Sequence, residues 1–351
     1  MDSIKNNVRF MIIALGIAAF GFGNQNSCAQ DTVFLNTGRP VRGKIANSSP
    51  NELQVGSETV AIQDIKKISL SGAPRELGRA KDDIESGQYD DAWAELQKIT
   101  ETPTGMVLQE YKYAESFLKG KLALQGGSVS TEEALRNIGQ FLQQYPNSFR
   151  HYPLVELYGE LLVASNEIAK AENAFQKLSG SALPDYQLRG LFSLGQTQLL
   201  TGKFPEAQAT FGELQNHPLN DVVAQQYKTM AKCQAAKAMA LSPQGDVEQA
   251  QGLIEKIIKE ENPDNKELFA YCYNALGVCN FKNGDIKGAS LAFLHTDLLF
   301  STEPDAHAES LYYLNKLWLK MEQTDRANRA RQILSANYGN SYWKIKLDTG
   351  S

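Results

Sequence analysis

Residues for metal, thiol or imidazole chemistry are scarce in this chain. Its 351 residues include only four cysteines and four histidines. The histidines lack the short spacings at which protein segments present metal ligands; they are His151, His217, His295 and His307. The glycine-rich segments lack the Lys-Ser/Thr of a phosphate loop, and no G-x-S-x-G motif for a nucleophilic serine occurs. The sequence therefore predicts no catalytic residue, no metal site and no cofactor, and we expect a protein that is not an enzyme.

A strong excess of one charge is also absent. The formal net charge is −5, and charged residues make up 21% of the chain. A nucleic-acid-binding surface normally needs a basic face, so this mild acidity argues against a nucleic-acid partner. No run of like charges is long enough to predict a disordered tail.

Long apolar runs are limited to one, from Phe10 to Phe22. Lys5 and Arg9 precede this run, and small residues at 27 and 29 offer a cleavage site after Ala29. This layout is typical of a secretory signal peptide covering residues 1–29. A membrane span needs about 20 apolar residues. A transmembrane anchor is therefore the less favoured interpretation, and we expect no integral membrane span in the mature chain.

Cys28 allows a third interpretation of this N-terminal segment, a lipid anchor of the kind found in bacterial lipoproteins. Their motif has leucine three residues before the cysteine, whereas this chain has Gln25. After cleavage three cysteines would remain, namely Cys233, Cys272 and Cys279. An odd number does not suggest a disulfide framework, so we expect them to be small buried hydrophobic residues.

Residues 30–72 show an alternation of apolar and polar positions that predicts short strands. The alternating apolar residues are Val33 and Leu35, Val41 and Ile45, Leu53 and Val55, and Val60 and Ile62. We expect four or five strands forming one small curled, barrel-like antiparallel module. The run from Val33 to Ala46 resembles the first hairpin of small SH3-like or Sm-like barrels. That resemblance implies binding of RNA or peptides, as in cytoplasmic relatives, but export and the near-neutral charge of this chain favour a docking or capping role instead.

The pattern changes to helical spacing after residue 73, and its clearest example runs from Leu191 to Pro218. Apolar residues recur every three or four positions up to Leu199, Gly202 supplies a turn, and Pro205 suits the first turn of a second helix. The second half then places Ala207, Phe211 and Leu214 on one helix face. This stretch therefore predicts two short helices folded into a hairpin.

This hairpin resembles the tetratricopeptide repeat (TPR), whose pattern is W-x2-L-G-x2-Y, then A-x3-F, then P. Leu194-Gly195, Ala207, Phe211 and Pro218 match it, while Leu191 and Gln198 replace the aromatic positions. Partial copies recur along the chain, each marked by a small residue followed four positions later by a second marker. These pairs are Ala92/Leu96, Ala134/Ile138, Ala171/Phe175, Ala207/Phe211, Ala250/Ile254, Ala289/Phe293 and Ala327/Arg331.

The repeats predict a mainly α protein: a right-handed, TPR-like α-solenoid of about seven helical hairpins over residues 73–345, after the small antiparallel β module. Residues 346–351 would form a C-terminal tail. The turn inside a hairpin is expected at Gly87, Asn166, Gly202 or Gly284 in four of the units. An ordinary helical bundle with chance Ala-x3-apolar pairs is the alternative.

Two junctions between repeats, FLQQYPNS from Phe141 and LSANYGNSYW from Leu334, resemble those of bacterial cell-envelope TPR proteins. The resemblance implies an exported protein, periplasmic or associated with the outer membrane. A solenoid of this kind has a concave groove lined by the first helix of each hairpin.

By the family's register, the groove would present six residues from the last two hairpins: Asn274, Val278, Phe281, Tyr312, Lys316 and Leu319. Packing inside the fold is the alternative role for each of them, and the sequence alone identifies no binding residue. We expect an exported, non-enzymatic scaffold or adaptor whose groove binds a partner protein or peptide in the cell envelope. The alternative function is an envelope protein that binds a small ligand or glycan.

Overall fold

The computed structural model describes residues 30–350, so the predicted signal peptide and Cys28 lie outside the described residues. The strands are β1 (Thr32–Leu35), β2 (Val41–Arg42), β3 (Ile45–Ser48), β4 (Glu52–Val55), β5 (Glu58–Ala61) and β6 (Ile65–Ser69), with a 3-10 turn, η1 (Ile62–Asp64), before β6. The helices of the first three hairpins are α1 (Arg75–Glu85), α2 (Tyr89–Gln97), α3 (Gly105–Leu124), α4 (Thr131–Gln144), α5 (His151–Ala164) and α6 (Ile168–Ser179). Those that follow are α7 (Pro184–Leu200), α8 (Phe204–Gln215), α9 (Val222–Leu241), α10 (Val247–Glu260), α11 (Lys266–Lys282), α12 (Ile286–Leu299), α13 (Pro304–Lys320), α14 (Thr324–Asn337) and α15 (Tyr342–Thr349).

The strands form a small antiparallel β module, as predicted, but in two three-stranded sheets rather than one curled sheet. The strand orders are β2-β1-β6 and β3-β4-β5. The chain passes from the first sheet to the second at Gly43, where an added Cβ would lie 2.9 Å from the backbone nitrogen of Gly56. Such close approach of two backbone segments excludes a side chain, so glycine is required at this bend. Alternate apolar residues of both sheets, including Val33 and Leu53, face one core.

The β module packs against the junction between α4 and α5, where the sequence has the YPNS motif. Phe149 belongs to the hydrophobic core of the β module. Ser48 Oγ donates to the backbone oxygen of Asn147 (3.1 Å), and Tyr152 Oη donates to Asn51 Oδ1 (3.3 Å). The motif therefore ends one repeat and also provides the surface on which the β module docks.

A buried ion cluster lies beneath this junction. Arg150 donates twice to Glu110, from Nε and Nη2, each at 2.9 Å, and Lys81 Nζ donates to Glu110 Oε2 at 2.7 Å. Burial by itself would raise the pKa of this carboxyl, but the two cations lower it to about 2. The cluster joins α1 and α3 to the start of α5, and Lys81 also donates to the backbone oxygen of Ile68 at the end of the β module.

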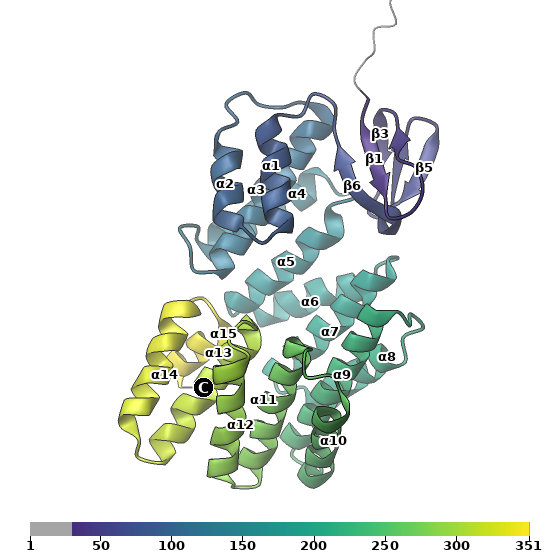
Figure 1. Ribbon diagram of the computed structural model, residues 1–351. Coiled ribbons are helices and arrows are strands. Elements are labelled where there is room, and N and C mark those ends of the chain that lie inside the picture. Colours follow the sequence, from purple (N-terminus) through teal and green to yellow (C-terminus); the bar gives the residue numbers. More distant parts are fainter. Residues whose placement is uncertain (1–29, 351) are drawn as a thin grey trace, which may run out of the picture.

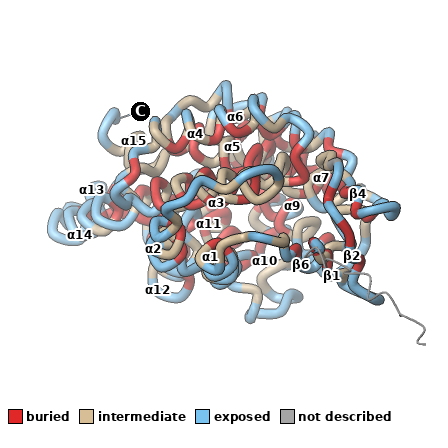
Figure 2. Tube along the Cα trace, turned by 90° about the horizontal axis from the view of Figure 1, so that it is seen from above, coloured by how far each residue is buried: buried red, intermediate tan, exposed pale blue. Residues whose placement is uncertain are grey.

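Helices α1 to α14 pair in sequence into seven hairpins stacked side by side, which confirms the predicted α-solenoid. The small residues that mark the second helix of each hairpin are all fully buried: Ala92, Ala134, Ala171, Ala207, Ala250, Ala289 and Ala327. The predicted turn residues Gly87, Asn166, Gly202 and Gly284 have positive φ values of 73°, 59°, 74° and 80°. Figure 2 shows buried residues running through the middle of the stack.

The aromatic residue of the second helix packs onto the glycine of the first helix. A Cβ added at Gly195 would lie 2.6 Å from the ring of Phe211, and the same close approach joins Gly159 to Phe175 and Gly277 to Phe293. The glycine is therefore needed to admit the ring. Phe211 supplies the side-chain atoms nearest to Gly195 in the fold, so the two pattern residues Gly195 and Phe211 pack on each other.

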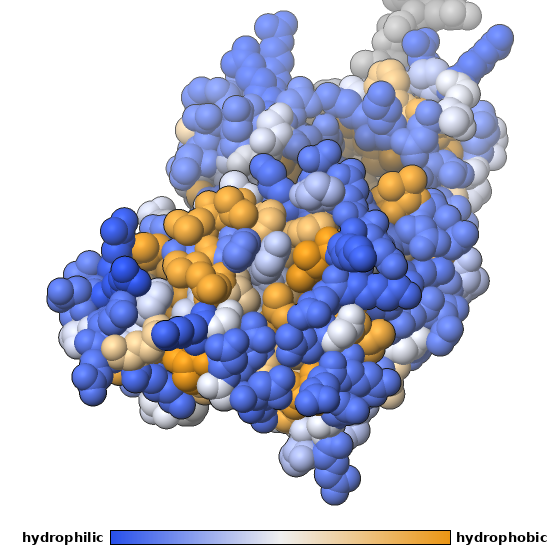
Figure 3. Space-filling model, turned by 60° about the horizontal axis from the view of Figure 1, so that its bottom comes forward, coloured by the Kyte–Doolittle hydropathy of each residue, from blue (hydrophilic) through white to orange (hydrophobic). Residues whose placement is uncertain are grey.

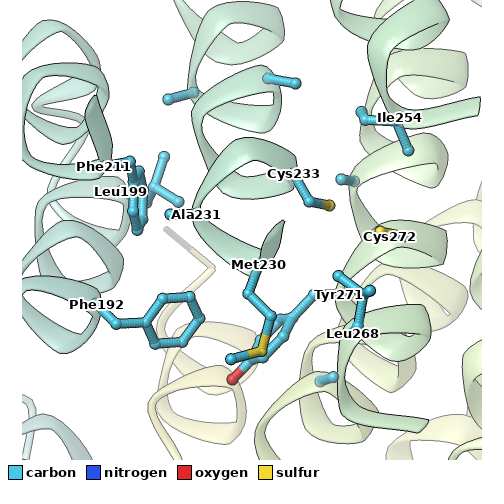
Figure 4. Packing of buried hydrophobic residues seen from close by; sticks show 14 of the residues in the cluster. Phe192, Leu199, Phe211, Met230, Ala231, Cys233, Ile254, Leu268, Tyr271 and Cys272 are labelled. Atoms are coloured by element: carbon cyan, nitrogen blue, oxygen red, sulfur yellow. The ribbon is translucent and has the colours of Figure 1, made fainter. Parts of the chain in front are cut away.

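The largest core runs through α7 to α11. Figure 4 shows Phe192, Met230 and Tyr271 gathered on one side of it, with Cys233 and Cys272 between α9 and α11. Cys233, Cys272 and Cys279 are all fully buried, as expected for small hydrophobic residues. Within residues 30–350, every helix is too short or too polar to cross a bilayer.

The stack curves back on itself, so its last hairpin comes under α3 and α5 in Figure 1. Two hydrogen bonds link the C-terminal segment to earlier hairpins: Asn340 Nδ2 donates to the backbone oxygen of Ala123 at the end of α3 (3.1 Å), and Tyr342 Oη donates to that of Leu200 at the end of α7 (3.1 Å). Asn340 lies just before α15, and Tyr342 is its first residue. This helix continues to Thr349, across residue 345, where the sequence analysis begins a tail.

Candidate binding surface on the inner face

The first helices of the hairpins form the inner face of the curved stack. Two contacts that skip a whole hairpin identify this side: Phe192 on α7 lies 5.6 Å from Tyr271 on α11 between ring centroids, and Lys237 on α9 pairs with Glu309 on α13. Side chains two hairpins apart can meet only on the inside of a curve, because the outside spreads them. The candidate site is built on this face.

A cavity of about 410 Å³ lies between α5, α7 and α9. The lining residues are Glu156, Glu160, Asp185, Leu188, Arg189, Val223 and Tyr227. Three of them are carboxylates and one is a cation. A volume of this size suits a side chain or short segment of a ligand, since small-molecule sites begin at about 300 Å³.

The cation in the cavity is already neutralised. Arg189 Nε donates to Glu156 Oε1 at 2.7 Å, and a second guanidinium hydrogen bond reaches Glu156 Oε2. Burial raises the pKa of Glu156, and Arg189 opposes that rise. With this pair balanced, Glu160 and Asp185 leave the cavity with a net negative charge. Lys121 Nζ lies 2.9 Å from Glu160 and offsets part of it.

More carboxylates face the cavity from the far end of the stack. Asp305, in the first turn of α13, has its pKa raised to about 6, chiefly because the surrounding protein removes part of its hydration and also because Glu160 is near. Its side chain is still open to water. The pKa of Glu267 on α11 is raised by burial and by the carboxylates of Glu303 and Asp305. The inner face therefore concentrates negative charge contributed by α5, α7, α11 and α13.

Aromatic side chains line the same face next to the carboxylates. Phe192 makes edge-to-face contacts with Tyr227 and Tyr271, at centroid distances of 5.7 and 5.6 Å. Burial raises the pKa of Tyr227 to about 12, so its hydroxyl stays protonated. Figure 4 shows Phe192 and Tyr271 on either side of Met230. Phe192 and Tyr271 are buried, whereas the partly exposed ring of Tyr227 lies in the cavity lining beside the carboxylates and suits a cationic ligand, which is attracted by both.

A buried polar group extends this face along α9, α11 and α13. Lys237 Nζ donates to Glu309 Oε1 at 2.5 Å, and Asn274 Nδ2 donates to Glu309 Oε2 at 3.1 Å and to the backbone oxygen of Ala306 at 2.7 Å. Asn274 Oδ1 and both amide atoms of Gln234 are buried without a hydrogen-bond partner among residues 30–350. Unsatisfied buried amides are uncommon in folded proteins and call for an explanation.

Three of the six residues expected in the groove are buried in the fold: Asn274, Val278 and Tyr312. The side-chain amide of Asn274 donates a hydrogen bond within the protein, and Tyr312 packs against Trp343 of α15. Phe281 is partly buried, while Lys316 and Leu319 are exposed. The family register thus finds the right helices, but the tight curvature buries positions that would line an open groove.

The sequence did not identify the acidic residues of the inner face, because they come from separate helices. Asp185, Glu267 and Asp305 do lie in first turns of α7, α11 and α13. Placement in the first turn lowers a carboxylate pKa, whereas the pKa values of Glu267 and Asp305 are raised. An acidic residue recurs at the start of the first helix of several hairpins, and this recurrence in the sequence could have indicated the acidic inner face.

The four histidines have separate structural settings. His307 Nε2 bonds to Asp297 Oδ1 at 2.8 Å, and its Nδ1 bonds to Tyr338 Oη at 2.7 Å. His295 instead stacks on Tyr273, with ring centroids 4.5 Å apart. Among residues 30–350, groups of three or more His, Cys, Asp or Glu side chains placed to hold a metal ion are absent.

The outer face differs in kind from the inner one. Figure 3 shows apolar residues in patches among hydrophilic ones on the face seen from below. Leu291 and Leu298 of α12 are 60% and 72% exposed and lie two helical turns apart. These leucines form an exposed stripe without the charge and cavity that distinguish the inner face.

Comparison with solved structures places this chain among TPR-like folds. A tetratricopeptide repeat protein from Parabacteroides merdae ATCC 43184 is similar with a TM-score of 0.53 and 16% identity, over 78% of this chain and 96% of that one. A Rap protein, solved in complex with Competence and Sporulation Factor, is similar with a TM-score of 0.53 and 12% identity, over 79% of this chain and 78% of the other.

Neither the family models nor the curated proteins match this sequence. At these identities the structural likeness concerns the fold alone. It confirms a mainly α protein whose helices stack in TPR-like pairs, preceded by small antiparallel sheets.

Proposed function

We propose that this protein is a non-enzymatic scaffold whose inner face binds a basic segment of a partner protein. The observation that carries this proposal is the acidic cavity between α5, α7 and α9, whose lining includes three carboxylates and the ring of Tyr227. TPR-like folds expose extended inner surfaces, which such repeat proteins use for binding. The Rap protein, which shares this fold, was solved with a factor bound to it.

The charge of the inner face selects the kind of partner. Glu160, Asp185, Glu267 and Asp305 attract lysine and arginine side chains and repel acidic segments. The partly exposed ring of Tyr227 in the cavity lining adds a favourable contact with the same cations. Because Asp305 and Glu267 are open to water, a ligand can reach them without unfolding the stack.

Titration of Asp305 provides the test. The pKa of this carboxyl is about 6, so it is mostly charged at pH 7.5 and mostly protonated at pH 5.5. A fluorescent lysine-rich peptide should therefore bind several-fold more weakly at the lower pH, as measured by anisotropy at constant ionic strength. Asp305→Asn should weaken binding at pH 7.5 and remove most of this pH dependence.

An exposed carboxylate on an outer helix provides the matched control. Glu255→Gln on α10 should leave both the affinity and its pH dependence unchanged. Equal binding of the peptide to the Asp305→Asn variant and to the original protein at pH 7.5 would refute the proposed site. Binding of an acidic peptide with the same affinity would refute the selection for basic partners.

The proposal includes export to the cell envelope, based on Lys5, Arg9 and the apolar run of residues 10–22. Mass spectrometry of the protein purified from its source would identify the mature N-terminus. Gln30 at that end supports a cleaved, free protein, and a lipid on Cys28 supports a tethered one. An intact Met1 would count against export.

A further inference from the structure

Helix α15 differs from the other helices of the described chain in how it is held. It has eight residues, and none of them is fully buried, whereas each of α1 to α14 contains buried residues. An isolated helix shorter than about 12 residues is marginal in water. The helical state of α15 therefore depends on its contacts with the rest of the protein, and these contacts are only partly shielded from solvent.

The position of α15 is not that of a further repeat. In this stack the first helix of a hairpin packs closely on the second helix of the preceding hairpin, as α13 does on α12, in addition to its own partner helix. Helix α15 instead packs mainly on α13, a first helix, and the ion pair from Arg331 to Asp348 (3.3 Å) joins it to α14. It therefore lies on the inner face, where a bound segment of a partner would lie.

Aromatic contacts hold α15 on this face. The Trp343 ring lies 5.2 Å from that of Tyr312 and 5.9 Å from that of Tyr313, measured between centroids. The hydroxyl of Tyr342 reaches across the hollow to the backbone oxygen of Leu200. These adjacent aromatic residues thus bridge α13 and α7.

A lysine of α15 lies against the aromatic rings of α13. Lys346 Nζ lies 5.6 Å from the centre of the Tyr312 ring, within reach of a cation–π contact. Partial burial lowers the pKa of Lys346, the attraction of Glu309 on α13 opposes that shift, and repulsion by Lys316 and Lys237 adds to it. Glu309 is also the acceptor for Lys237 and Asn274. The basic side of α15 therefore faces the buried polar group of α9, α11 and α13.

The unsatisfied amides lie in this same polar group. Gln234 is one helical turn before Lys237 on α9, and Asn274 is bonded to Glu309. Both are fully buried.

We propose that α15 is a built-in ligand of the inner face and competes there with a partner segment of similar chemistry: two adjacent aromatic residues followed by alternate lysines. This inference rests on the proposed binding function and names the partner class for it. With α15 docked, only the fraction of molecules in which it has left can bind the partner there, so the apparent affinity is reduced by that fraction.

The experiment uses the full-length protein and a labelled synthetic peptide with the sequence of residues 339–351, GNSYWKIKLDTGS. Trp343→Ala removes the main contact of α15, so its amides should exchange with deuterium faster than in the original protein, while those of α13 keep their protection. The peptide should then bind the variant at least tenfold more tightly than the original protein, as measured by anisotropy. A peptide with alanine at both aromatic positions is the matched control and should not bind.

Thermal unfolding followed by circular dichroism shows whether the Trp343→Ala variant is folded. If the Trp343→Ala variant is not folded, the Tyr342→Phe variant is used in its place. This change removes only the hydrogen bond to Leu200, and it should likewise speed the exchange of the α15 amides and tighten peptide binding. Equal peptide binding by variant and original protein, or α15 amides as protected as those of α13 in both, would overturn the inference. The lysine-rich peptide used to test Asp305 lacks aromatic residues, so its binding would still support the proposed function in that case.

Discussion

Single residues decide how closely the helices of a hairpin approach. Gly195 and Phe211 occupy positions that the TPR pattern identifies from sequence, and the fold confirms that both are buried. The contact between Gly195 and Phe211 could not be predicted from the sequence. A helical pattern shows which face of the helix a residue occupies, but not where along that helix a ring from the opposing helix packs. Asn274 and Tyr312 illustrate the same limit. The sequence predicted the helices that carry them, but their burial follows from the curvature of the stack.

Replacement of Gly195 by alanine tests the close approach. The added Cβ would lie 2.6 Å from the Phe211 ring, so the ring or the helix must move. Overpacking of this kind typically costs about 1–3 kcal/mol. Gly212→Ala on α8 is the matched control, because nothing lies within 4 Å of its Cβ and alanine favours a helix by up to about 1 kcal/mol. Urea unfolding should show a lower midpoint for the first variant and an equal or higher one for the second.

The carboxyl of Glu110 makes stability depend on pH. Its pKa is about 2 in the fold and about 4.5 when exposed, so the unfolded chain takes up a proton first as pH falls. The stabilisation is therefore complete above pH 4.5 and is lost between pH 4.5 and 2, and it amounts to about 3 kcal/mol.

Glu110→Gln should flatten that part of the curve of unfolding free energy against pH and should lower stability at pH 7, because Arg150 stays buried without its charge partner. Glu255→Gln, at an exposed site on α10, should leave the shape of the curve unchanged. A variant curve as steep as the original between pH 4.5 and 2 would assign the effect to other carboxyls.

At the scale of elements, the repeats were predictable and their mutual placement was not. The buried alanines such as Ala207 repeat at intervals that a single sequence reveals, since each hairpin contacts mainly its neighbours. The pair between Lys237 and Glu309 joins hairpins that are not neighbours, and no local pattern encodes it. The division of the β module into two sheets was not predictable either, because the bend at Gly43 depends on its contact with Gly56.

Removal of Lys237 should test how firmly α9 and α13 are joined. Lys237→Met leaves the buried carboxylate of Glu309 without its cation, which typically costs about 3–5 kcal/mol. The double variant Lys237→Met with Glu309→Leu removes both charges and should recover most of that loss in urea unfolding. A single variant as stable as the original protein would show that the pair contributes little.

For the molecule as a whole, the curvature of the stack creates the candidate site. An open stack would leave Glu160 on α5 far from Asp305 on α13, whereas here the charge of Glu160 helps to raise the pKa of Asp305. The position of the β module at the α4–α5 junction leaves this inner face uncovered by strands (Figure 1). The sequence predicts the scaffold, and the acidic surface follows from how far the scaffold bends.

The hydrogen bond from Asn340 to Ala123 has a further consequence, for the order of folding. In an open stack each hairpin can add to its neighbour, so folding can begin anywhere and contacts stay local in sequence. This bond joins residues 217 positions apart. It can form only after the intervening hairpins have taken their curvature, and closing the stack is therefore a late event. This contact becomes a reporter of completed assembly, and a probe near Asn340 should record a slower refolding phase than a probe in the α7–α8 hairpin.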